Sequence, residues 1–163
     1  MSVASVKKLQ STQFVLEKFK NSTKRILIFE HDDNICMDIQ KKLESKGYLV
    51  DRAQTLLNNN FLDFIPFRKA VLKVLALPNK NMPNLVIADI DTSNTKELEK
   101  LKKQCKRKKL PVIYITSEID DKIINEREKN AIGIFKKPFN TDTIIELITE
   151  YFKNKISIEP LNK

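Results

Sequence analysis

The sequence predicts an α/β domain built on a doubly wound, five-stranded parallel sheet with helices on both faces. Five short segments are continuous apolar runs, which is typical of strands that are buried on both faces of a sheet. Stretches with apolar residues at helical spacing separate these runs. Because strand and helix alternate along the chain, parallel pairing through crossover connections is expected. The length of 163 residues suits one such domain.

The composition indicates a globular protein that does not insert into a membrane. Apolar residues make up 41% of the chain and charged residues 31%, which is enough apolar material for one core. No apolar run approaches the roughly 20 residues of a membrane-spanning helix, and the first residues lack the apolar part of a secretory signal. We therefore expect a cytoplasmic protein. Cys36 and Cys105 have neither disulfide-framework nor zinc-site spacing.

The net charge of +9 raises the question of a nucleic-acid partner. The basic residues concentrate between Lys100 and Lys109, and no aromatic residue lies among them to stack on bases. A solvated helix face with a basic C-terminal end explains this cluster, because the helix dipole favours cations there. The sequence therefore disfavours nucleic acid as a partner.

The first half of the domain contains two predicted strands and one well-marked helix. Residues 25–29 form an apolar run that ends in charged residues, and residues 48–50 form a second, shorter strand. Between them, apolar residues recur at helical spacing from Ile35 to Leu43, and Gly47 is placed to terminate the helix. A basic extension, residues 1–23, precedes this part of the chain.

Residues 53–83 form an enlarged region around the second helix of the domain. We expect the helix itself at about 66–77, with Pro66 in its first turn and Pro78 just after its end. The apolar residues of this region exceed what one helix stripe can bury against a sheet. The surplus either folds back over the domain and its extension or forms a protein–protein contact, such as a homodimer.

The second half of the chain repeats the alternation three times. The domain is expected to span residues 24–155, and a short tail, residues 156–163, follows it. Strands are expected at residues 85–89, 112–116 and 132–136, and helices at residues 96–108, 120–130 and 143–152, the last capped near Asn140 or Thr141.

Four polar residues stand where predicted strands end: Glu30, Asp89, Thr116 and Lys137. In a parallel α/β sheet, ligands bind outside the carboxyl ends of the strands, so these side chains are expected to converge in one crevice. Carboxylates, a hydroxyl and an ammonium group together suit the transfer and binding of a phosphoryl group. The sequence therefore predicts a phosphate site at this edge.

Four motifs at these strand ends carry a family resemblance. They are R-I-L-I-F-E-H-D, P-N-L-V-I-A-D, P-V-I-Y-I-T-S and F-K-K-P-F, in this order along the chain. With them, residues 24 to about 153 resemble the CheY-like receiver domain of two-component response regulators, which has a flavodoxin-like fold. The resemblance implies a histidine kinase or phosphotransfer protein as phosphoryl donor and a downstream protein as target.

The resemblance also implies roles for individual residues. Asp89 would be the phosphoacceptor, Thr116 the switch hydroxyl and Lys137 the ammonium that pairs with the phosphoryl group. A cis peptide bond is expected before Pro138. Ser117 is interpreted as a small residue that leaves room for the phosphoryl group.

In this family Mg²⁺ bridges the acceptor and the phosphoryl group. The resemblance implies that Glu30, Asp89 and the backbone carbonyl of Asp91 would hold the metal. The family's second acidic residue after the first strand is His31 here, and imidazole is a poor ligand for a cation that prefers oxygen. The carboxylate of Asp32 or of Asp91 is available in its place, so His31 and Asp32 are the weaker metal candidates.

Further positions depart from the family pattern. Ser93 stands where a proline is usual after the acceptor, and Glu97 where a glycine is usual. The aromatic residue that normally moves with the threonine aligns with Ile134, or with Phe135 if the alignment slips by one residue. The alignment at Ile134 would leave the usual aromatic readout missing.

These observations favour a stand-alone receiver module that is phosphorylated on Asp89 and signals by protein docking, without an enzymatic activity on other substrates. One alternative is a pseudo-receiver, an interaction module of the same fold that no longer cycles phosphate. A remote alternative is a haloacid-dehalogenase-like phosphatase, because residues 88–92 also resemble a D-x-D-x-T loop. That family needs a later acidic pair at a strand end, which this sequence does not offer.

Overall fold

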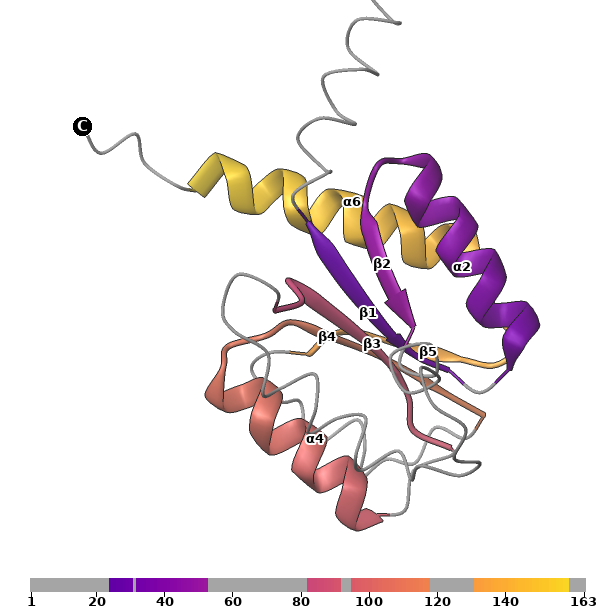
Figure 1. Cartoon of the computed structure of the whole chain (residues 1–163), viewed down its shortest axis with the longest axis vertical. Coiled ribbons are helices and arrows are strands. Elements are labelled where there is room, and N and C mark those ends of the chain that lie inside the picture. Colours follow the sequence, from indigo (N-terminus) through magenta and orange to yellow (C-terminus); the bar gives the residue numbers. More distant parts are fainter. Residues whose placement is uncertain (1–23, 31, 53–81, 92–94, 118–130, 159–163) are drawn as a thin grey trace, which may run out of the picture.

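The computed structural model describes residues 24–30, 32–52, 82–91, 95–117 and 131–158. These residues form five strands and three helices around one sheet (Figure 1). The basic extension, His31, most of the enlarged region at 53–83 and the helices expected at 66–77 and 120–130 lie outside the described residues.

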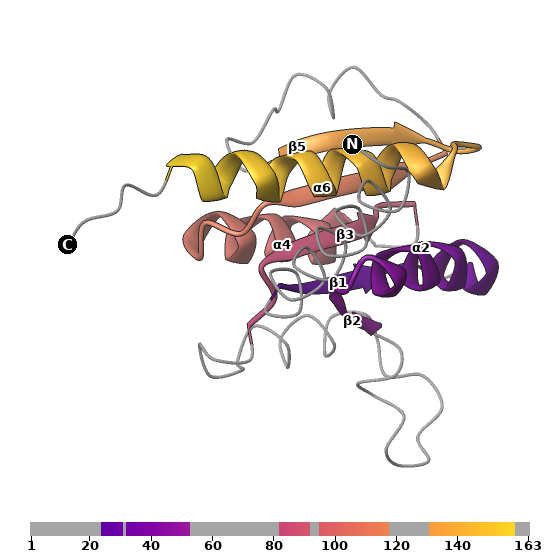
Figure 2. The same ribbon diagram turned by 90° about the horizontal axis from the view of Figure 1, so that it is seen from above.

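The described strands form one all-parallel sheet in the order β2-β1-β3-β4-β5. Figure 2 shows this order from above, with the labelled strands running from β5 at one edge to β2 at the other. The predicted five-stranded parallel sheet is confirmed. Three strands have the expected bounds, and the two edge strands differ from them by one or two residues. The strands are β1 (Arg25–Phe29), β2 (Leu49–Arg52), β3 (Leu85–Asp89), β4 (Val112–Thr116) and β5 (Ala131–Lys136).

Helices cover both faces of the sheet, as predicted. Helices α2 (Asp33–Ser45) and α6 (Thr141–Ile158) pack on one face, and α4 (Thr95–Arg107) packs on the other (Figure 1). Helix α6 ends at Ile158, six residues after the end expected at residue 152. Apolar residues continue at helical spacing beyond Phe152, which explains the longer helix.

Burial on both sides explains why the strands read as continuous apolar runs. In β1, Ile26 and Ile28 pack in the layer with α2 and α6, whereas Leu27 and Phe29 pack in the layer with α4. All four side chains are at most 2% exposed. Successive strand residues point to opposite faces, so a strand covered on both faces needs apolar residues at every position.

Helix α2 begins and ends at residues that satisfy its free backbone groups. The carboxylate of Asp32 accepts hydrogen bonds from the backbone amides of Asn34 and Ile35 at 2.9 and 3.2 Å, which is the usual N-cap arrangement. At the other end, Gly47 has a φ of 90°, and its amide donates to the carbonyl of Glu44. Gly47 therefore terminates the helix as predicted.

A polar contact joins α2 to the start of α6. The Lys42 ammonium lies 2.9 Å from the Asp142 carboxylate and donates to the Thr141 hydroxyl at 2.6 Å. The Thr141 hydroxyl in turn donates to Asp38 on α2. These contacts fix the N-terminus of α6, and so help to position the short segment from the end of β5 to α6.

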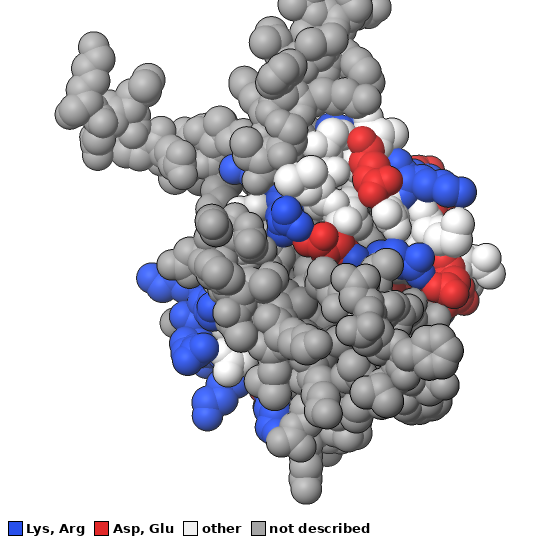
Figure 3. Space-filling view, viewed as in Figure 1, with Lys and Arg blue, Asp and Glu red and all other residues white. Residues whose placement is uncertain are grey.

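The charged side chains are distributed unevenly. Acidic and basic residues alternate over the α2 side, whereas basic residues dominate the α4 side (Figure 3). On α4, Lys100, Lys103, Lys106 and Arg107 are exposed. The basic stretch thus lies on an exposed helix face, and its solvated character stays a prediction. No helix within the described ranges is long and apolar enough to cross a membrane.

Candidate functional site

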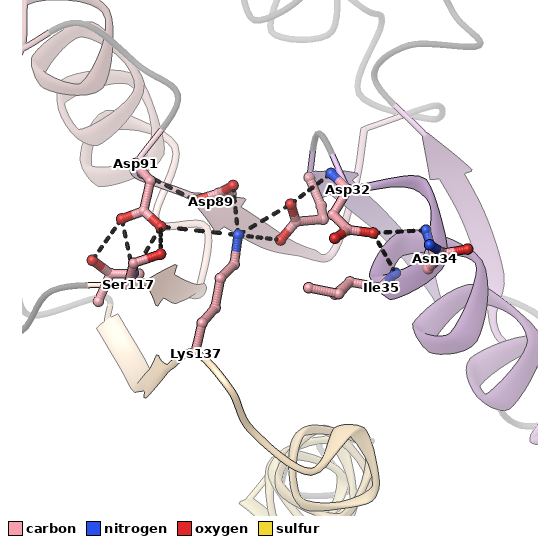
Figure 4. Close-up of polar contacts among 9 residues, drawn as sticks. Asp32, Asn34, Ile35, Asp89, Asp91, Ser117 and Lys137 are labelled. Atoms are coloured by element: carbon pink, nitrogen blue, oxygen red, sulfur yellow. Dashed lines mark hydrogen bonds and ion pairs between the residues drawn. The ribbon is translucent and has the colours of Figure 1, made fainter.

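The four strand-end residues that the sequence singled out come together at one edge of the sheet. Glu30 follows β1, Asp89 ends β3, Thr116 ends β4 and Lys137 follows β5. Because the strands are parallel and in register, with Asp89 opposite Ile115 and Thr116 opposite Lys136, all four ends reach the same edge. Figure 4 shows the contacts that connect the acidic residues and Lys137.

Lys137 lies at the centre of this cluster. Its Nζ atom is 2.9 Å from Oδ2 of Asp89 and 3.2 Å from each carboxylate oxygen of Glu30. Burial lowers the pKa of Lys137, but its hydrogen bonds to Asp89 and Glu30 outweigh that effect and raise the pKa above its usual value. The ammonium is therefore charged and neutralises part of the negative charge of two carboxylates.

The backbone next to Lys137 holds its side chain in place. The peptide bond before Pro138 is cis, as expected from the F-K-K-P-F motif. The Lys137 amide donates to the carbonyl of Thr116 at 2.7 Å, which ties this segment to the end of β4.

Glu30 is a fully buried carboxylate. Its Oε1 atom accepts a hydrogen bond from the backbone amide of Asp32 at 2.9 Å. Its Oε2 atom is buried and makes no hydrogen bond within the described residues, although the Lys137 ammonium is near it. Burial is the main reason why the pKa of Glu30 lies above its ordinary value, and the nearby charge of Asp89 raises it further. The buried oxygen is thus suited to a further cation or a proton.

Asp89 is held so that one oxygen faces the backbone and the other faces Lys137. The Oδ1 atom accepts a hydrogen bond from the amide of Asp91 at 2.9 Å, and Oδ2 accepts one from Lys137. The residue is 1% exposed and ends the central strand β3. A carboxylate fixed beside an ammonium in this way is chemically able to receive a phosphoryl group.

The carboxylate of Asp91 is directed at the end of β4. Its Oδ1 atom accepts a hydrogen bond from the Thr116 hydroxyl at 2.8 Å, and Oδ2 accepts one from the Ser117 hydroxyl at 2.7 Å. The Ser117 amide lies 2.9 and 2.7 Å from the two oxygens. Burial raises the pKa of Asp91, but the hydrogen bonds from Ser117 and Thr116 outweigh it and lower the pKa.

Sequence reasoning missed Ser117 as a donor to an anion. We interpreted it only as a small residue, whereas its hydroxyl and its amide both bind the Asp91 carboxylate. A signal was available in the two consecutive hydroxyl residues at the end of the buried strand, Thr116 within it and Ser117 directly after it.

The metal ligands suggested by the sequence are only partly assembled. The carboxylates of Glu30 and Asp89 converge, whereas the Asp32 carboxylate is turned to the amides of α2 as its N-cap (Figure 4). Asp32 is therefore a capping residue and not a ligand in this arrangement. Among the described residues, no group of three or more His, Cys, Asp or Glu side chains is placed to hold a metal ion. His31 lies outside them.

The structure resolves the choice between Ile134 and Phe135. Ile134 pairs with Tyr114 and packs in the α4 layer, which is the face of β4 on which Thr116 also lies, two residues after Tyr114. Phe135 packs in the opposite layer, with its ring 6.2 Å from that of Phe139. The residue on the same face as Thr116 is therefore aliphatic.

Comparison with known proteins gives one curated relative. The chain is 30% identical over 141 residues to the probable transcriptional regulator ycf29 of Porphyra purpurea, an alignment that covers 84% of this chain. The chain spans 58% of the length of that relative. No family model matches the sequence.

Several solved structures with a similar fold are receiver domains. A CheY-like receiver domain protein from Methanospirillum hungatei superimposes with a TM-score of 0.60 at 23% identity, covering 82% of this chain and 97% of that chain. The signal receiver domain of a LuxO repressor protein from Vibrio parahaemolyticus gives a TM-score of 0.58 at 19% identity, covering 83% and 97%. The described part of the chain therefore has the CheY-like receiver fold of response regulators.

Proposed function

We propose that this chain is a receiver module that accepts a phosphoryl group on Asp89 and signals by docking to a downstream protein. The donor would be a histidine kinase or a phosphotransfer protein, and the cell compartment the cytoplasm. The observation that carries the proposal is the position of Lys137, whose ammonium binds Asp89 at 2.9 Å and also contacts the buried Glu30.

The geometry supports the following transfer step. An Asp89 carboxylate oxygen forms a bond to phosphorus while the bond between phosphorus and the imidazole nitrogen of the donor breaks, and the imidazole then takes up a proton. The Lys137 ammonium offsets the repulsion between the Asp89 carboxylate and the phosphoryl oxygens. The Thr116 hydroxyl ends the neighbouring strand and donates to Asp91 in this structure, and in the proposed step it donates instead to a phosphoryl oxygen.

Mg²⁺ is the metal that this fold family typically uses, and when bound it neutralises charge on the acceptor and the phosphoryl group. Glu30, Asp89 and the backbone carbonyl of Asp91 would hold it here. The oxygen donors fit its chemistry, and the buried Oε2 of Glu30 makes no hydrogen bond within the described ranges. With His31 in place of a second acidic residue, we propose that binding is weak.

A second candidate is a pseudo-receiver that binds partners without cycling phosphate. The described residues bring two carboxylates together but no set of three metal-binding side chains, and this favours it. The phosphatase alternative has no such support. In that class the acceptor strand opens the core, whereas β1 and β2 here precede the strand that bears Asp89.

Phosphorylation with a small-molecule donor separates these candidates. The full chain is incubated with acetyl phosphate, with and without Mg²⁺, and its intact mass is measured. A gain of one phosphate that disappears in Asp89→Asn supports the receiver function. Glu44→Gln, which changes an exposed carboxylate near the C-terminal end of α2, is the control and should still be labelled.

Two other results would decide against the receiver function. Labelling that persists in Asp89→Asn would show that the acceptor is wrong. A parent chain that takes up no phosphate at any donor or Mg²⁺ concentration would favour the pseudo-receiver.

A further inference from the structure

We propose that the Asp91 carboxylate is a built-in competitor of the phosphoryl group. It occupies the hydrogen-bond donors that phosphoryl oxygens on Asp89 would need, so it must leave them before phosphate is held there. This inference rests on the proposed function, because it concerns the regulation of the same site.

The first argument is the number and type of contacts to Asp91. The Thr116 hydroxyl, the Ser117 hydroxyl and the Ser117 amide donate to its two oxygens at 2.7 to 2.9 Å. The Lys137 ammonium lies 3.9 Å from Oδ2. Hydrogen bonds to an ionised acceptor are about twice as strong as neutral ones. The carboxylate is therefore held against the end of β4, although its side chain is 26% exposed.

The second argument is that these donors cannot serve two anions at once. A hydroxyl and a backbone amide each have a single proton to donate. Carboxylate and phosphoryl oxygens accept the same hydrogen bonds, and both carry negative charge. Each donor that Asp91 occupies is thus unavailable to a phosphoryl group on Asp89.

The third argument is the closeness of the two carboxylates along the chain. Asp91 is two residues beyond Asp89, and its amide donates to Asp89 Oδ1 at 2.9 Å. A competitor tethered this closely acts at a high effective concentration that dilution does not change. Incoming phosphate therefore always meets the competing carboxylate.

The test uses beryllium fluoride, which forms a phosphoryl analogue on a carboxylate, in the presence of Mg²⁺. Binding to the full chain is followed by fluorine NMR. Asp91→Asn should lower the concentration for half-saturation by roughly tenfold, since it removes the charged acceptor from the donors. Glu44→Gln also removes one negative charge, but at the C-terminal end of α2, which is the end away from the site. This control should bind the analogue as the parent does.

A second variant distinguishes competition for donors from a simple loss of negative charge. Ser117→Ala removes one hydrogen bond to Asp91 but leaves the Asp91 charge and the Ser117 amide in place. Competition predicts that Ser117→Ala weakens binding more in the Asp91→Asn background than in the parent, because in the parent the Asp91 carboxylate already occupies that donor. A pure charge effect predicts the same weakening in both backgrounds. Asp91→Ala takes the place of Asp91→Asn if thermal unfolding shows that Asp91→Asn does not fold.

The outcomes separate this inference from the proposed function. If the parent, Asp91→Asn and Ser117→Ala bind equally, and all need Asp89, the competitor is overturned while Asp89 stays the acceptor. If none of the variants binds the analogue, the acceptor function is overturned, and the inference that rests on it is overturned as well.

Discussion

The Nζ atom of Lys137 lies 2.9 Å from Oδ2 of Asp89, across 48 positions in the sequence. The same ammonium contacts both oxygens of Glu30, so one cation balances two buried carboxylates. A negative charge that is only partly compensated in a buried site is costly, and the expected effects of changing Glu30 and Lys137 depend on that imbalance.

Replacing Glu30 by Gln should raise the melting temperature at pH 7. The pKa of Glu30 is higher in the folded than in the unfolded protein. The folded state therefore loses stability as the pH rises through the raised pKa, because Glu30 must then ionise in a buried site. Gln fits the same space, accepts the hydrogen bond from Asp32 and has no charge to desolvate. A gain of about 1 kcal/mol would raise the melting temperature by roughly 2–4 °C.

The pH dependence of this gain provides the check. The melting temperatures of the parent and of Glu30→Gln, measured in the presence of a chelator, should converge as the pH falls to the ordinary pKa of Glu, about 4.5. Glu30 of the parent is then protonated and uncharged. Glu44→Gln, on exposed α2 surface, should leave melting unchanged at every pH. An unaltered melting temperature of Glu30→Gln at pH 7 would contradict the prediction.

Replacing Lys137 by Met should destabilise the domain. It leaves Glu30 and Asp89 facing each other without a cation, and because the Lys137 side chain is 20% exposed we expect a loss of roughly 2–3 kcal/mol, below the full cost for a buried pair. The loss is measured as the free energy of unfolding in urea. Adding Glu30→Gln to Lys137→Met should restore part of this loss, whereas additive effects of the two changes would show that Glu30 and Lys137 are not energetically coupled.

Replacing His31 by Asp should strengthen Mg²⁺ binding, because it supplies carboxylate oxygen where the chain has imidazole. We expect roughly tenfold tighter binding in a calorimetric titration, since affinity follows the number of charged oxygen ligands. If the parent already binds Mg²⁺ as tightly as His31→Asp, the interpretation that His31 weakens Mg²⁺ binding is wrong.

Asp32 allows helix capping to be tested separately from metal binding. Asp32→Ala removes the acceptor for the amides of Asn34 and Ile35 and should cost about 1 kcal/mol of stability, whereas Asp32→Asn keeps an acceptor and should cost little. Neither variant should change Mg²⁺ affinity. A loss of Mg²⁺ binding in Asp32→Asn would instead make this residue a ligand.

Much of the fold could be predicted because strand patterns are local. Residues 25–29, 85–89 and 112–116 are strands with the bounds expected from the sequence, since each contains a run of four apolar residues with a polar residue directly after it. The parallel order follows from the alternation with helices. It brings Glu30, Asp89, Thr116 and Lys137 to one edge, as expected.

Only the tertiary structure decided which polar groups at that edge bind one another. Asp32, Asp89 and Asp91 all lie at or just after a strand end. The family resemblance singles out Asp89, but the spacing does not show which groups the carboxylates of Asp32 and Asp91 bind. In the folded chain Asp32 caps α2, Asp89 binds Lys137 and Asp91 binds Ser117. The sequence by itself determined which side chains reach the crevice, through periodicity and strand ends. Their partners depend on distances of a few ångströms between separate strands, which packing sets and local patterns do not encode.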